Sequence, residues 1–277
     1  MGLISWLANR TRPMVSVLRL SGIIGQLGPF RTGLTAYSLE EAIQRAFAPK
    51  RLAAVALLIN SPGGSPVQSA LIAKRIRAAA EKRHVPVLAF TEDVAASGGY
   101  WLACAADEIF VDENSIIGSI GVISSGFGFA EAIARLGIER RLYTAGERKS
   151  LLDSFLPEKP EDVARLTRLQ TEIHASFKSM VSKRRGNRLK GEEGDLFSGE
   201  FWTGQRAVAL GLADGLGELR ATVKERFGER VRIKVIPPQR GGWRRRLGLT
   251  GPADAAAWPA ALLAAFEERA LWSRFGL

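Results

Sequence analysis

The sequence has few of the residues on which several common classes of site depend. It contains a single cysteine, Cys104, and two histidines, His84 and His174. One cysteine excludes an intramolecular disulfide and a thiolate metal cluster, and two histidines argue against a multi-histidine metal site. The sequence also lacks the Gly-rich phosphate-binding loops of nucleotide enzymes. We therefore expect neither a metal nor a cofactor.

Long apolar runs are absent as well. No run reaches the roughly 20 residues that a membrane-spanning helix needs, and the N-terminal patch Leu3–Ala8 lacks the basic start and long apolar stretch of a secretory signal. We therefore expect a cytoplasmic protein. The C-terminal region is nevertheless basic from Arg230 to Arg246 and rich in aromatic residues: Trp243, Trp258, Phe266, Trp272 and Phe275. Such a tail either makes peripheral contact with lipid at the inner membrane or faces solvent or another subunit.

Positive charge predominates, with 39 Lys and Arg against 28 Asp and Glu, a net charge of +11. This balance suggests an anionic neighbour but does not define the fold. The basic residues cluster at Lys183–Arg185, Arg188, Lys190 and Arg244–Arg246. A charge run is usually a solvated face, and the sequence contains no recognised nucleic-acid module, so we expect no nucleic-acid partner.

Apolar strand patterns alternate with helical patterns along most of the chain. The nearly continuous apolar run Ala53–Asn60 is typical of a parallel strand covered on both faces. Further strands are expected at Val15–Leu20, Val85–Thr91, Glu108–Val111, Ile116–Ile123, Glu139–Thr144 and Val231–Ile236. The alternation predicts an α/β layered fold with a mostly parallel sheet. Residues 1–236 are expected to form one domain and residues 237–277 a tail.

Helices are expected between these strands. The capping-box pattern Ser38-Leu-Glu-Glu41 predicts a helix that begins there and extends to about Phe47. The most regular pattern lies at Glu161–Lys183, where apolar residues recur every three or four positions and predict one long amphipathic helix. Other helices are expected at Val67–Ala80, Gly98–Ala105, Phe129–Leu136, Arg206–Leu210 and Leu219–Phe227.

Two glycine-containing junctions follow predicted strands. In Asn60-Ser-Pro-Gly-Gly64, the glycines allow a sharp turn whose amides could stabilise an oxyanion, although a Gly-Gly pair is more often only a turn. In Ala96-Ser-Gly-Gly-Tyr-Trp101, Ser97 is either an N-cap or a nucleophile. As a nucleophile it would have the amide of Gly98 beside those of Gly63 or Gly64, where the dipole of the following helix favours negative charge.

A nucleophilic serine needs a base. His84 lies beside two cations in a predicted turn, and His174 lies in the long helix, so neither is a good candidate. Lysine can act as a base where burial favours its neutral form. Lys149 follows the predicted strand Glu139–Thr144, whose end is a place where a catalytic group could enter a cleft, and it is the one lysine that lies there. From spacing alone, a solvated loop lysine is the commoner case.

Together these segments resemble the signal peptide peptidase A and SohB group of Ser/Lys-dyad serine peptidases. The resemblance covers roughly Val15–Phe227 and rests on five segments in the family's order: Asn60-Ser-Pro-Gly-Gly64, Ala96-Ser-Gly-Gly-Tyr-Trp101, Gly118-Ser-Ile-Gly-Val122, Gly146-Glu-Arg-Lys-Ser150 and Thr203-Gly-Gln-Arg-Ala-Val-Ala-Leu-Gly-Leu-Ala-Asp214. It implies a ClpP/crotonase-like fold.

The resemblance also implies roles for individual residues. Ser97 corresponds to the nucleophile, Lys149 to the general base and Ser119 to the hydroxyl that orients the lysine. The oxyanion amides fall on Gly64, with Gly63 as an alternative, and on Gly98. Short members of the family are expected to form ring- or dome-shaped homo-oligomers in which serine and lysine come from neighbouring protomers. Many relatives carry an N-terminal membrane anchor that this sequence does not show, which leaves the compartment less certain than the chemistry.

The resulting hypothesis is a serine endopeptidase that hydrolyses apolar peptides such as cleaved signal peptides. The apolar residues Tyr100, Trp101 and Leu102 would suit such substrates, with core packing as the alternative. A crotonase-like acyl-CoA enzyme is a rival that would use the Gly-Gly amides but need neither Ser97 nor Lys149. A non-catalytic scaffold at a membrane surface is the second rival.

Overall fold

The computed structural model describes residues 12–26, 33–146, 148–237 and 269–276. These residues belong to two compact units. The first comprises Met1–Ile120 and Lys178–Leu277, and the second comprises Gly121–Phe177.

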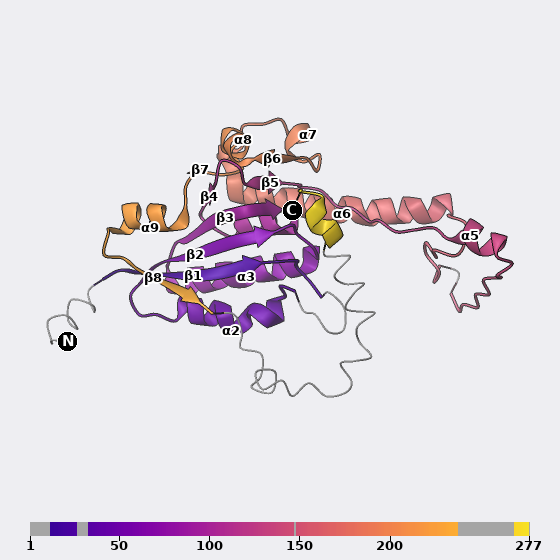
Figure 1. Ribbon diagram of the computed structural model, residues 1–277, viewed down its shortest axis with the longest axis horizontal. Coiled ribbons are helices and arrows are strands. Elements are labelled where there is room, and N and C mark those ends of the chain that lie inside the picture. Colours follow the sequence, from indigo (N-terminus) through magenta and orange to yellow (C-terminus); the bar gives the residue numbers. More distant parts are fainter. Residues whose placement is uncertain (1–11, 27–32, 147, 238–268, 277) are drawn as a thin grey trace. The chain divides into compact units, whose positions relative to one another are not determined.

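An eight-stranded sheet forms the centre of the first unit (Figure 1). Its main path runs β6-β5-β3-β2-β1-β8, and β4 pairs with both β3 and β7. Every pairing is parallel except that of β5 with β6. The predicted mostly parallel sheet is therefore confirmed. The strands are β1 (Met14–Ser21), β2 (Leu52–Ser61), β3 (Val87–Ala96), β4 (Glu108–Val111), β5 (Ile116–Gly118), β6 (Phe201–Thr203), β7 (Gly215–Leu216) and β8 (Arg232–Ile236).

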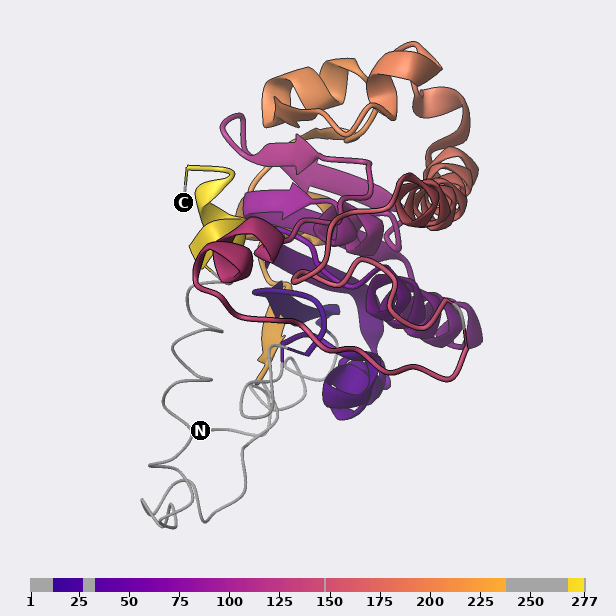
Figure 2. The same ribbon diagram turned by 90° about the vertical axis from the view of Figure 1, so that its right-hand side faces the viewer.

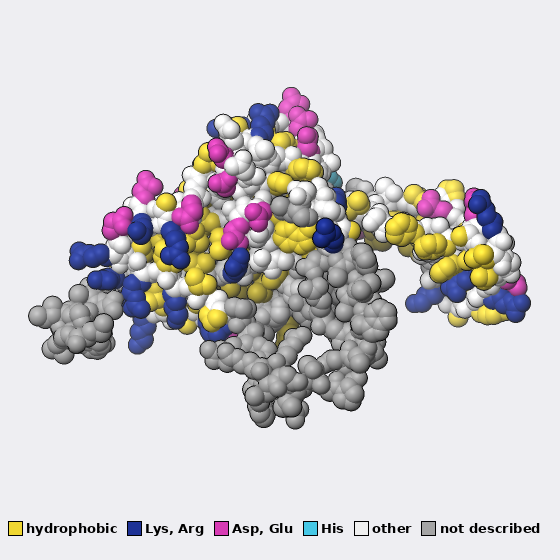
Figure 3. Space-filling view, viewed as in Figure 1, with side chains coloured by type: hydrophobic (Ala, Val, Ile, Leu, Met, Phe, Trp, Pro, Cys, Tyr) yellow, Lys and Arg dark blue, Asp and Glu magenta, His cyan; other side chains and the backbone are white. Residues whose placement is uncertain are grey.

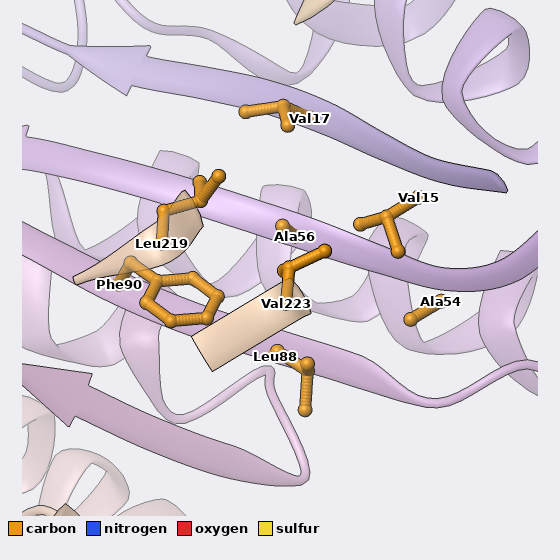
Figure 4. Close-up of a cluster of buried hydrophobic side chains, with 8 residues drawn as sticks. All are labelled: Val15, Val17, Ala54, Ala56, Leu88, Phe90, Leu219 and Val223. Carbon is orange, nitrogen blue, oxygen red and sulfur yellow. The ribbon is translucent and has the colours of Figure 1, made fainter. Parts of the chain in front are cut away.

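Helices cover both faces of this sheet (Figures 1 and 2). Helices α2 (Ala36–Phe47), α3 (Pro66–Arg83) and α4 (Gly98–Ala103) form one layer, in which α3 contacts both of the others. Helix α9 (Leu219–Phe227) packs on the strands through Leu219 and Val223 (Figure 4). Helix α8 (Gly204–Ala209) contacts β5, β6 and β7. The short helix α7 (Glu193–Leu196) precedes β6 in the chain, and residues Gly186–Arg188 form a 3-10 helix.

The apolar run of β2 is explained by these two layers. Ala54 and Ala56 point toward α9, in a cluster with Val15, Val17, Leu88 and Phe90 (Figure 4). Val55 and Leu57, which alternate with these two alanines along the strand, are also completely buried. Because successive residues of a strand point to opposite faces, a strand covered on both sides is apolar throughout rather than alternating.

The first helix begins earlier than expected. Thr35 is its N-cap, and Ser38 is the third helical residue. The hydroxyls and amides of these two residues hydrogen-bond reciprocally, each at 3.0 Å. The predicted capping box was therefore placed one turn too late, because Ser38 is a typical N-cap residue that here completes the box of Thr35.

The second unit contains α5 (Ala130–Arg135) and most of α6 (Pro160–Arg185). The predicted long helix is thus confirmed. The strand predicted at Glu139–Thr144 was wrong, since these residues are irregular. The structure assigns no strand to the described residues of 121–177 with which they could pair, and an isolated strand leaves its backbone groups without partners. Instead, Arg140 and Arg141 pair with Asp153 and Glu139.

The predicted tail lies mostly outside the described residues, so its lipid contact stays a prediction. Its last described residues, 269–276, pack on the first unit, where Phe275 is buried. Within the described ranges, no helix is both long enough and apolar enough to cross a membrane.

Candidate active site

Ser97 stands at a strained turn between β3 and α4. Its backbone has φ +52° and ψ −119°, a conformation that residues with a side chain rarely adopt. Such strain costs about 1–3 kcal/mol and persists only where the surrounding structure imposes it. Here the Ser97 amide donates to the carbonyl oxygen of Gly118 at 2.8 Å, and its carbonyl oxygen accepts from the amide of Trp101 at 3.0 Å. The turn projects a half-buried serine between the strand and the helix.

The loop after β2 packs directly against this turn. A Cβ atom on Gly63 would lie 2.8 Å from the Cβ of Ser97 and 2.9 Å from the amide nitrogen of Gly98. A Cβ on Gly98 would lie 3.3 Å from the amide nitrogen of Gly64. Only glycines allow the two backbones to come this close, and Gly63 and Gly64 also have φ of +110° and +138°. The structure therefore brings Ser97, Gly63, Gly64 and Gly98 together.

The backbone amides differ in their hydrogen bonds. The Gly63 amide donates to Ser61 Oγ at 3.2 Å. Within the described residues, neither the Gly64 amide nor the Gly98 amide donates a hydrogen bond. Of the two glycines that the sequence left as alternatives, Gly64 thus has the amide available to an acceptor.

The side chain of Asn60 links the end of β2 to the end of β3. Asn60 donates from Nδ2 to Asp93 at 2.6 Å and accepts from the amide of Val94 at 3.3 Å. Between Ile59 and Ser61 the pairing of β2 with β3 shifts, and the amide side chain bridges the irregularity. This role of Asn60 could not be predicted from the sequence, in which its position at the end of an apolar strand is the available signal.

Ser119 follows the strand next to Ser97. Strands β3 and β5 are parallel, and Ala96 of β3 pairs with Gly118 of β5. Ser97 directly follows Ala96, and Ser119 directly follows Gly118, so the two serines leave neighbouring strands at the same level. Ser119 also has a positive φ of 53°, and its amide donates to the carbonyl oxygen of Glu200 at 2.6 Å. Two strained, half-buried serines thus lie at the same edge of the sheet.

Lys149 belongs to the second unit. It lies exposed in a turn, where its amide donates to the carbonyl oxygen of Gly146 at 3.2 Å. The segment before it is irregular, so the expectation that Lys149 marks the end of a strand was wrong.

The apolar side chains after Ser97 are core residues. Tyr100 and Leu102 are fully buried, and Trp101 is 6% exposed. The Tyr100 hydroxyl donates to the carbonyl oxygen of Leu212 at 2.8 Å, and burial holds its pKa well above the ordinary value. The idea that these side chains present an apolar surface to substrate was therefore wrong, and core packing is their role.

Three arginines of the basic cluster are structural. Arg185, with its side chain 2% exposed, is bonded to both carboxylate oxygens of Asp214, and Arg188 reaches the same carboxylate. Arg184 donates to the carbonyl oxygens of Cys104 and Ala106. Burial alone would raise the pKa of Asp214, but its bonds from Arg185 and the Ile109 amide lower it overall. These arginines hold the end of α6 and so give little support to an anion-binding scaffold.

Comparison with known proteins is consistent with this geometry. Residues 79–230 match the family described as peptidase family S49. The chain is 50% identical over 272 residues to a protein of Brucella abortus named Na(+)/H(+) antiporter NhaA, covering 95% of this chain but 37% of that protein. It is 30% identical over 229 residues to the chloroplastic serine protease SPPA of Arabidopsis thaliana, covering 80% of this chain and 33% of that one. The chain therefore spans only about a third of the length of these relatives.

A solved structure supports the fold. The membrane-bound stomatin-specific protease 1510-N, a lysine-to-alanine variant with a substrate peptide, aligns with a TM-score of 0.52 at 15% identity. The alignment covers 86% of this chain and 96% of that one. This likeness confirms the ClpP-like fold that the family resemblance implied. Since the family match includes more than half of the sequence, the chain belongs to peptidase family S49.

Proposed function

We propose that the chain is a serine endopeptidase that hydrolyses apolar peptides, such as cleaved signal peptides, with a Ser97/Lys149 dyad. The single observation that carries this proposal is the strained turn at Ser97, packed against glycine backbone that leaves the Gly64 and Gly98 amides available. A serine that served only as an N-cap would bond to the helix amides, but Ser97 makes no such side-chain bond. Family membership favours peptide hydrolysis over acyl-CoA chemistry.

In the proposed mechanism, Ser97 Oγ attacks the peptide carbonyl while Lys149 Nζ accepts the hydroxyl proton. The amides of Gly64 and Gly98 donate to the oxyanion that forms, a contribution typically worth a few kcal/mol for each donor. The lysine then returns the proton to the leaving amine, and water releases the acyl group by the same proton transfers in reverse order. The Ser119 hydroxyl orients the lysine amine.

We propose further that Lys149 meets Ser97 of a neighbouring protomer. The second unit, which carries Lys149, exposes many large apolar side chains (Figure 3). Leu169 and Ile173, from the apolar stripe of α6, are 52% and 38% exposed, and Phe127 and Leu136 are 79% and 75% exposed. So many exposed large apolar side chains in a short stretch of chain are typical of a surface that binds protein. A homo-oligomer, ring- or dome-shaped in this proposal, would bury it and could complete the site.

The test is hydrolysis of an apolar fluorogenic peptide, together with labelling by a fluorophosphonate that reacts with activated serines. The full chain should cleave the peptide and incorporate the label, and Ser97→Ala should do neither. Ser182→Ala, which removes an exposed hydroxyl from helix α6, serves as the matched control and should behave like the unaltered protein. Equal labelling of Ser97→Ala and the unaltered protein would exclude Ser97 as the nucleophile.

A further inference from the structure

The last described residues of the chain lie beside strands β3 and β5 (Figure 2). They pack there against apolar side chains of the two strands that precede the proposed serines. Phe275 is 8% exposed and packs against Val94 and Ala96 of β3, with Ile116 of β5 and Trp272 at the side of the cluster. Its ring also meets Phe201 of β6 edge-on, with 5.3 Å between ring centres. One aromatic side chain thus spans three adjacent strands.

These strands are the ones that position the two serines. Ala96 directly precedes Ser97, and its partner Gly118 directly precedes Ser119. Phe201 lies opposite Gly118 on the other side of β5. The patch formed by Val94, Ala96, Ile116 and Phe201 therefore adjoins Ser97 through Ala96, and Phe201 pairs with the residue that precedes Ser119.

The chemistry of the patch defines what it can bind. All four of its side chains are apolar. They bind the ring of Phe275 by burying its surface, and Phe201 adds an edge-to-face contact between the two rings. The neighbouring residues of the C-terminal segment contribute little, since Arg269, Ser273 and Arg274 are exposed. A short segment held mainly by Phe275 and Trp272 is suited to leave and return, because few contacts oppose its release.

We propose that this patch is a subsite for a large apolar side chain of a peptide, and that Phe275 of the chain's own C-terminal segment occupies it as an internal competitor. The subsite rests on the proposed peptidase function, whereas the docking of the segment does not. While Phe275 is in place, a peptide crossing the site has no access to the patch. Its apparent affinity is reduced by the fraction of molecules in which the segment is docked.

The first experiment measures docking without any need for catalysis. The probe is a fluorescent peptide with the sequence of residues 269–277, and its binding is followed by anisotropy to full-length protein carrying Ser97→Ala. Adding Phe275→Ala to this protein should tighten probe binding at least about tenfold by emptying the patch. Adding Arg274→Ala, which alters an exposed neighbour, should leave it unchanged. A probe in which alanine replaces the residue equivalent to Phe275 should not bind.

The second experiment tests the subsite. An unlabelled peptide of Leu, Phe and Ala should displace the probe from the Phe275→Ala protein, and a peptide of Ser and Gly of equal length should not. Equal probe binding by the Phe275→Ala and Arg274→Ala proteins would overturn the docking, whether or not the chain proves to be a peptidase. Probe binding that the apolar peptide fails to displace would overturn the subsite. If the unaltered protein hydrolysed no peptide but the binding results were as expected, only the proposed function would be contradicted.

Discussion

The amide of Ser97 donates to the carbonyl oxygen of Gly118, with 2.8 Å between the two atoms. This bond extends the pairing of β3 with β5 one residue beyond the last strand residue of β3. It therefore fixes Ser97 relative to Ser119, which follows Gly118 directly. The proposed nucleophile is positioned by the sheet itself and not by a mobile loop.

Replacement of Gly63 should damage the site and the fold together. In Gly63→Ala the new Cβ would meet Ser97 at 2.8 Å and would require φ of +110°. We expect a loss of about 1–3 kcal/mol in the free energy of unfolding and at least about a tenfold fall in kcat/KM, because a shift of the Ser97 turn misplaces the reacting atoms. Urea denaturation and peptide hydrolysis measure the two effects.

Gly228→Ala is the matched control for this change. Gly228 also has a positive φ, of +87°, but a Cβ there would meet nothing within 4 Å. It should lower stability through backbone strain alone and leave kcat/KM unchanged. If both variants reduced kcat/KM equally, the close packing at Ser97 would not be the cause.

Mixing two inactive variants should restore activity if protomers share their dyads. Ser97→Ala chains keep Lys149, and Lys149→Ala chains keep Ser97, so a mixed oligomer contains some complete sites. Random mixing of equal amounts gives about a quarter of the sites with both residues intact. The measurement is peptide hydrolysis after the two proteins are dissociated and reassembled together.

The control for mixing uses another exposed lysine of the second unit. Lys159→Ala should be active on its own, because Lys159 is exposed and lies outside the proposed dyad. A mixture that stays inactive, in oligomers shown by mass to contain both chains, would place serine and lysine in the same protomer.

Stability should depend on the ion pair of Asp214 with Arg185. Asp214→Asn leaves a guanidinium that is 2% exposed without its carboxylate, and we expect a loss of about 3 kcal/mol in the free energy of unfolding at neutral pH. The pKa of Asp214 lies below its ordinary value of 3.8 in the folded chain. Its contribution is therefore present above that value and is lost as the pH falls through the folded-state pKa.

Urea unfolding of both proteins at several pH values tests this prediction. The difference between the unaltered protein and Asp214→Asn should be constant near neutral pH and shrink below about pH 4. Glu131→Gln, which breaks an exposed pair with Arg135, should unfold like the unaltered protein throughout. A difference that grew on acidification would contradict the assignment.

Cys104 should be inert in the folded protein. Burial raises the pKa of its thiol to about 11, so at pH 8 about one thiol in a thousand would be ionised even if a reagent reached it. Because the chain has one cysteine, a disulfide reagent such as dithionitrobenzoate reports this residue alone. Release of the chromophore should follow unfolding in urea, and a fast reaction in the absence of denaturant would refute the prediction.

Hydrophobic patterns in the sequence correctly predicted two kinds of element: helices whose hydrogen bonds are formed within the element, and strands that are buried on both faces. The apolar run of β2 and the three-to-four repeat of α6 both formed as expected. Predictions failed where the outcome depends on a distant partner. Residues 139–144 have a strand-like composition, but a strand needs a neighbour for its hydrogen bonds. Residues 201–203 were not predicted as a strand, and they formed β6 by pairing with β5.

The candidate site was predicted in part. The glycines at 63, 64 and 98 and the serine at 97 were readable from the sequence, because a close backbone approach and a positive φ call for glycine. The sequence did not indicate which of Gly63 and Gly64 has an amide available to an acceptor. That difference depends on the hydrogen bond from the Gly63 amide to Ser61 Oγ. The roles of Asn60 and of Arg184, Arg185 and Arg188 also depend on partners that are distant along the chain.

The sequence by itself determined the alternation of strands and helices, the buried character of β2, and the residue types at the Ser97 turn. These follow from hydrophobic periodicity and from the backbone freedom of glycine, which are local properties. Only the tertiary structure decided that Tyr100 and Trp101 belong to the core and that Phe275 covers the patch beside Ser97. Burial is a property of the assembled fold, because each side chain is removed from water by residues that lie far from it in the sequence.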